Sequence, residues 1–72
     1  MSIMAKHLTT VDEVIEKLGG FYSVTELTQQ NYTSAVHNWQ ARRKFPAHTY
    51  AVLQKALHEK GLTAPKTLWG MM

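Results

Sequence analysis

The 72-residue chain contains no cysteine and only two prolines, and 18% of its residues are charged. The lack of cysteine excludes disulfide bonds and zinc sites built on thiolates. No apolar run approaches the roughly 18 residues of a membrane-spanning helix, and the first residues lack the apolar core of a secretory signal. These absences fit a protein of the reducing cytoplasm, which is the location we expect.

Signatures of catalysis and of metal binding are also missing. The sequence has no Gly-rich phosphate loop and no pairing of a nucleophile with a base. His37 could bind a metal, but no partner stands at helical spacing from it among the other histidines, His7, His48 and His58. We therefore expect no enzymatic activity, no cofactor, no metal site and no small-molecule ligand.

Acidic residues are scarce in the second half of the chain, so the charge is unevenly distributed. Residues 1–31 hold two lysines against four acidic residues, whereas residues 32–72 hold six lysines and arginines against Glu59 alone. These segments carry −2 and +5 within a net charge of +3. Nucleic-acid binding requires such an electropositive end, although many small proteins are mildly basic.

Apolar residues recur at helical spacing in several short segments. Residues 1–8 precede the first of them and are predicted to form a flexible leader. Thr10 and Glu13 have the spacing of a capping box, so a helix begins after Thr10. Gly19-Gly20 ends this helix, whose inward stripe is Val11, Val14, Ile15 and Leu18.

A second helix is predicted from Phe21 to about Thr28, followed by a polar turn at residues 29–31. Its inward residues are Phe21, Val24 and Leu27. The third helix begins near residue 33, where Thr33 or Ser34 can cap it. It runs to residue 44, because the residue before a proline is pushed out of the helical region.

Pro46 can stand at the first position of a fourth helix, and Lys60 and Gly61 favour its end. The inward stripe of this helix is Tyr50, Leu53 and Leu57. We see neither strand alternation nor an internal repeat. The predicted fold class is therefore all-α, a compact bundle of four to five short helices.

The third predicted helix has an apolar side and a polar, uncharged side. Wound at about 100° per residue, it gathers on the apolar side Tyr32, Ala35, Val36 and Trp39. The other side holds Thr33, Ser34, His37, Asn38 and Ala41, followed by Arg42, Arg43 and Lys44. A solvated helix would carry Glu and Lys there. Short hydrogen-bonding side chains beside a basic flank suit base edges and phosphates of DNA.

Four segments of the chain, in this order, carry a resemblance to a known family: Val24-Thr-Glu-Leu27, Tyr32-Thr-Ser-Ala-Val36, Asn38-Trp39 and Ala41-Arg-Arg-Lys-Phe-Pro46. Over about residues 10–60 the chain resembles the Cro/C1-type (XRE-like) helix-turn-helix phage repressors and small Cro-like bacterial regulators. It departs from them in the turn, where Gln29-Gln30-Asn31 replaces a usual glycine and the spacing is one residue longer. It also departs where Phe21 or Tyr22 replaces a usual glutamine.

The resemblance implies a helix-turn-helix DNA-binding domain at residues 9–61 that reads the major groove of double-stranded DNA with helix 33–44. It implies base contacts from Thr33, Ser34, His37 and Asn38. It implies phosphate contacts from Tyr32, Arg42, Arg43 and Lys44.

The C-terminal tail, residues 62–72, has an unusual apolar load: Leu68, Trp69, Met71 and Met72. Exposed tryptophan and methionine usually mark a contact. The tail is therefore expected to fold back on its own core or to pack against a second copy of the chain. Trp39, at helical spacing from Val36, is expected in the core rather than as a stacking platform.

These observations predict a small cytoplasmic transcriptional regulator of phage or prophage type, a repressor that acts as a homodimer. Dimerisation is expected because one recognition helix reads only a few base pairs. Two alternatives stay open: a protein-interaction or antitoxin-like adaptor on the same scaffold, and a DNA-bending recombination accessory protein. Salt-dependent binding to random DNA would distinguish the regulator and the accessory protein from the adaptor. A preferred palindromic site without strong bending would distinguish the regulator from the accessory protein.

Overall fold

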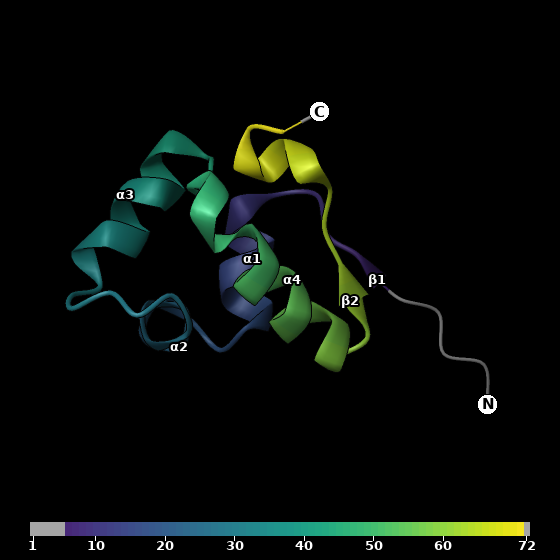
Figure 1. Ribbon diagram of the computed structural model, residues 1–72, viewed down its shortest axis with the longest axis horizontal. Helices are drawn as coiled ribbons and strands as arrows, with labels where there is room; N and C mark the ends of the chain where they lie inside the picture. The colour runs from purple at the N-terminus through teal and green to yellow at the C-terminus, as the bar shows by residue number, and fades with distance from the viewer. Residues whose placement is uncertain (1–5, 72) are drawn as a thin grey trace.

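Short amphipathic segments fold into four α-helices within residues 6–71, the part of the chain that the computed structural model describes (Figure 1). They are α1 (Val11–Lys17), α2 (Phe21–Leu27), α3 (Ser34–Arg42) and α4 (Tyr50–Glu59). A 3₁₀ turn, Ala47–Thr49, directly precedes α4, and a second one, Lys66–Trp69, lies near the C-terminus. The mostly helical, compact fold is confirmed, with a Cα radius of gyration of 11.6 Å. No helix in this part is long and apolar enough to cross a membrane.

The start of α1 is fixed by the predicted cap. The Thr10 hydroxyl accepts a hydrogen bond from the Glu13 amide at 3.2 Å. The Glu13 carboxylate accepts from the Thr9 amide at 3.0 Å, one residue before the amide that a capping box uses. Chiefly through this bond, and also through the Thr9 hydroxyl, the pKa of Glu13 is held below its usual value.

The apolar stripes of the four helices meet in one core. Each helix contributes side chains with no exposure: Val14, Val24, Val36, Leu53 and Leu57. The inward stripe predicted for α1 is confirmed in full. Three residues predicted to point inward are half-buried and pack at the edge of the core: Phe21, Leu27 and Tyr50. Burying one aliphatic side chain such as Val36 contributes about 1.5–3 kcal/mol to the free energy of unfolding. The apolar side of α3 therefore anchors this helix to the core.

The first and last parts of the described chain form a small parallel β pair, which corrects the all-α prediction. Strand β1 (Lys6–His7) pairs with β2 (Leu62–Thr63), and the next amide, of Leu8, donates to the Thr63 carbonyl at 2.7 Å. Two residues per strand are too few to show alternation. The flexible leader predicted for residues 1–8 is also wrong at its end, because Leu8 is fully buried. Residues 1–5 lie outside the described part.

The C-terminal tail folds back on its own core, one of the two arrangements expected for it. Leu68 and Trp69 are buried, and Met71 packs against the core. The Trp69 indole N–H donates to the Thr49 hydroxyl at 3.1 Å, and the amide of Phe45, just beyond α3, donates to the Leu68 carbonyl at 2.7 Å. The interface that these residues were predicted to offer a second copy is therefore occupied within the chain. Met72 lies outside the described residues.

Candidate nucleic-acid interface

Helix α3 lies beside α2 at one end of the molecule (Figure 1). Its polar side chains are exposed to solvent. Val36 and Trp39 are buried, which confirms the predicted apolar side and the core position of Trp39. Ala35 is half-buried at the edge of the same core. Apart from Arg42 at its C-terminal end, the exposed residues of α3 are those predicted for the polar side: Ser34, His37, Asn38 and Ala41. The helix therefore presents hydroxyl, imidazole and amide groups, with no charged residue among these four, to whatever approaches.

Thr33 and Tyr32 precede the helix rather than belonging to it. Thr33 is half-buried and already has helical backbone angles, φ −66° and ψ −15°, instead of the extended angles that a side-chain cap uses. Tyr32 is 76% exposed, so its predicted place on the apolar side is wrong. The helical-wheel angle does not apply to it, because Tyr32 lies in the turn. Its hydroxyl is left accessible beside the start of α3.

The turn between α2 and α3 contains a strained residue. Gln29 has φ 58°, in the left-handed region that favours glycine. The next amide, of Gln30, donates to the Thr25 carbonyl at 3.0 Å, which ties the turn to the end of α2. The left-handed residue that this turn needs is thus present, supplied by a glutamine.

The three cations at the C-terminal end of α3, Arg42, Arg43 and Lys44, are all exposed but do not share one helical face. The helix predicted to reach residue 44 ends at Arg42, because Arg43 adopts left-handed angles with φ 59°. Arg42 and Lys44 line one hollow, beside Trp39 and Phe45. Arg43 instead lines a hollow at the start of α1 that includes Asp12. Two of the three cations therefore line one hollow, and the third lines another together with Asp12.

A stacked pair of rings joins α2 to the polar side of α3. The ring centroids of Phe21 and His37 are 3.9 Å apart and their planes differ by 16°. Sequence reasoning missed this contact, because residues 16 positions apart on different helices share no local pattern. It also missed Tyr22, which is 73% exposed on α2. Tyr22 and Tyr32 line the same hollow, and only the packing of α2 against the turn reveals this.

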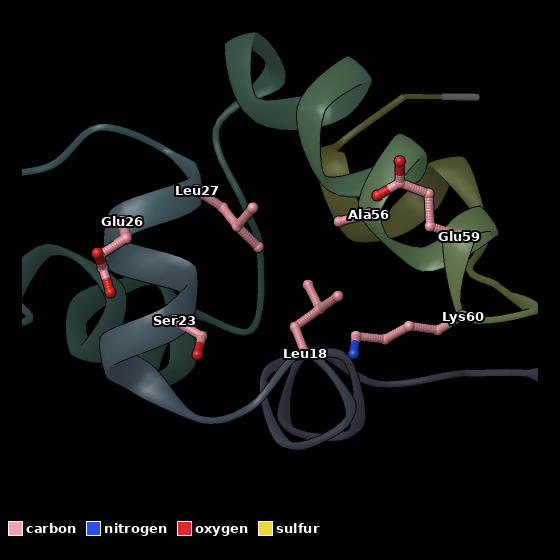
Figure 2. A pocket seen from close by; sticks show the side chains of 7 residues that line it. All are labelled: Leu18, Ser23, Glu26, Leu27, Ala56, Glu59 and Lys60. Carbon is pink, nitrogen blue, oxygen red and sulfur yellow. The ribbon is translucent and has the colours of Figure 1, made fainter.

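A second surface lies between α1, α2 and α4. Figure 2 shows Leu18, Leu27 and Ala56 pointing into this hollow, which is also lined by Ser23, Glu26, Glu59 and Lys60. Among residues 6–71, no group of three histidine, cysteine or acidic residues could hold a metal ion. The candidate nucleic-acid interface is the exposed polar side of α3.

Comparisons of the chain with protein-family models, with curated proteins and with solved structures return no match.

Proposed function

We propose that this chain is a sequence-specific DNA-binding transcriptional regulator with a Cro/C1-like helix-turn-helix formed by α2, the turn and α3. The observation that carries the proposal is the exposed, uncharged polar side of α3 with exposed cations at and just beyond its C-terminal end. Such a helix fits the major groove, where side-chain donors and acceptors meet base edges and cations meet phosphates. The resemblance to Cro/C1-type proteins supports the same assignment.

In this proposal Ser34, His37 and Asn38 face base edges, because they are exposed on one side of α3. Asn38 can donate to and accept from the edge of an adenine. Thr33 is half-buried and contacts the base nearest the start of the helix. The phosphate contacts fall to exposed residues on both sides of this face: Tyr32, Arg42, Arg43 and Lys44.

A palindromic site bound by a homodimer follows from the size of the reading surface, since one α3 spans only a few base pairs. The tail does not supply the interface, because Leu68 and Trp69 are buried in their own chain. A small protein that occupies a promoter can repress without any contact to the polymerase. Repression in the cytoplasm, in a phage or prophage setting, is therefore the role that we propose.

The test is a selection of bound sequences from a random pool of double-stranded DNA, followed by titration of the selected site and of random DNA. We expect a palindromic site, bound by two copies, with about 10³-fold or greater preference over random DNA. Asn38→Ala should leave the fold intact and cost about 1–3 kcal/mol on the selected site only. Lys55→Ala, an exposed change on α4, is the matched control.

Other outcomes would support other functions. Absence of salt-dependent binding to any DNA would contradict the proposal and favour the protein-interaction adaptor. Binding without a preferred sequence but with a strong bend would favour the recombination accessory protein. Loss of stability without loss of DNA binding in Asn38→Ala would place the reading face elsewhere.

A further inference from the structure

We infer that Phe21 is a positioning residue that determines which base His37 prefers, by holding the imidazole ring in one orientation. The inference rests on the proposed function, because it concerns the specificity of the same face. It concerns a residue that touches no DNA in the proposal and that is the first residue of α2.

The geometry of the pair is that of two rings in face contact. Their centroids are 3.9 Å apart with an angle of 16° between planes, closer than the roughly 4.5–7 Å of most aromatic pairs. Phe21 is half-buried and packs against the core, so its own ring is held. His37 is exposed in the middle of α3. A fixed ring therefore supports an exposed one.

The stack determines what His37 can offer a ligand. The phenyl ring of Phe21 covers one face of the imidazole. The hydrogen-bonding atoms of His37, Nδ1 and Nε2, lie on the edge of the imidazole ring, so the stack does not cover them. An N–H in a fixed plane points in a fixed direction, toward an acceptor such as N7 or O6 of guanine in the major groove. A free histidine would lose rotamer freedom on binding, whereas here part of that cost is already met in the unbound protein.

A merely structural role for Phe21 makes a different prediction. Leu27 lies on the same helix, is also half-buried and packs against the same core, but it points into the hollow of Figure 2. If Phe21 only stabilises the domain, Phe21→Leu and Leu27→Ala should weaken binding at every base pair alike. If Phe21 positions His37, only Phe21→Leu should change the preference at one base pair.

The experiment compares Phe21→Leu, Phe21→Tyr, Leu27→Ala and His37→Ala on the selected site and on its single-base variants. We expect His37→Ala and Phe21→Leu to relax the preference at the same base pair by about fivefold or more. Phe21→Tyr keeps the stack and should keep the preference. Phe21→Leu added to His37→Ala should cause no further change at that base pair, because the interaction it removes is already gone.

A readout without DNA accompanies the binding data. The ring current of Phe21 should shift the NMR signals of the His37 ring protons in the free protein, and Phe21→Leu should abolish that shift while Leu27→Ala preserves it. Phe21→Met replaces Phe21→Leu if thermal unfolding shows that the latter is not folded. The comparison then proceeds as before, since methionine is also apolar and has no ring.

The outcomes separate the inference from the proposed function. A Phe21→Leu protein that loses the stack but keeps the base preference of the parent would overturn the inference and leave DNA recognition intact. So would a preference relaxed evenly at all positions, as in Leu27→Ala. A parent protein that selects no sequence at all contradicts the proposed function first, and with it this inference.

Discussion

At the scale of the residue, two backbone positions carry strain that composition does not reveal. Gln29 and Arg43 are the two non-glycine residues with positive φ among residues 6–71, and each stands directly after or near the end of a helix in the candidate interface. Left-handed geometry costs an L-residue about 1–2 kcal/mol. At Arg43 the same geometry turns the chain so that Phe45 enters the core.

Replacement of Gln29 by glycine should therefore stabilise the protein. Removal of the left-handed strain outweighs the added backbone entropy of glycine, and we expect a gain of about 0.5–1 kcal/mol. Thermal unfolding should show a rise in Tm of roughly 2–8 °C for a domain of this size. Gln30→Gly is the control, because Gln30 has no positive φ and should lose stability. An equal response in both variants would contradict the explanation.

At the scale of the element, the cap of α1 makes stability depend on pH. The pKa of Glu13 is lowered mainly by the hydrogen bond from the Thr9 amide. Its stabilising contribution is therefore present above the ordinary glutamate pKa of about 4.3, and it is lost as pH falls through the lower folded-state pKa. The unfolded chain binds more protons in that window, so stability rises with pH there.

Glu13→Gln should make the free energy of unfolding less dependent on pH below about pH 5 than in the parent protein. Urea unfolding at a series of acidic pH values measures this difference. Glu16→Gln, an exposed change on the same helix, is the control. The explanation fails if Glu13→Gln and the parent lose stability in parallel as the pH is lowered.

The cations at the end of α3 should determine how strongly DNA affinity depends on salt concentration. Arg42 and Lys44 line the same hollow, whereas Arg43 lines a different hollow together with Asp12. Each neutralised phosphate adds about −0.9 to the slope of log K against log salt, so Arg42→Ala with Lys44→Ala should flatten the slope by roughly two. Arg43→Ala alone should change the slope by less than the roughly 0.9 expected for one phosphate contact, because the carboxylate of Asp12, which lines the same hollow, competes with phosphate.

Titration of random DNA at several salt concentrations measures these slopes. Lys17→Ala with Lys55→Ala removes the same charge from α1 and α4 and is the matched control. Equal flattening in the control would show that net charge, and not the end of α3, governs the salt dependence.

At the scale of the whole molecule, the C-terminal tail packs against the helical core. Trp69 is buried, stacks on Phe45 with ring centroids 5.1 Å apart, and meets Tyr50 edge to face at 5.2 Å. Its indole N–H donates to Thr49, whose hydroxyl donates to the Pro46 carbonyl at 2.7 Å. One side chain thus connects the residues after α3 with the start of α4.

Trp69→Ala should cost about 3–5 kcal/mol, the usual loss for a large buried aromatic, and this is a large share of the stability of so small a domain. Met71→Ala, at a half-buried neighbour, should cost clearly less. Thermal unfolding and the mass in solution are both measured. An unchanged Tm with a change from dimer to monomer would instead show that Trp69 serves an interface between chains.

Local patterns located the four helices to within a few residues at their ends, but they did not reveal the pairing of β1 with β2. The capping box at Thr10 and the spacing of Val11, Val14 and Ile15 located α1 within a residue or two, because caps and apolar stripes are local features. Strand β1 and buried Leu8 could not be found in this way. Their partners are about 56 positions away, and two paired residues leave no periodic signal.

The sequence by itself determined that α3 would bury Val36 and Trp39 and expose Ser34, His37 and Asn38, because a helix fixes the side of each residue once its period is known. Only the tertiary structure decided that Tyr32 stands outside the helix, that Arg43 turns away from Arg42, and that the tail covers its own core. It alone set Phe21 against His37. These features depend on left-handed turns and on contacts between distant segments, which the spacing of residues along a chain does not specify.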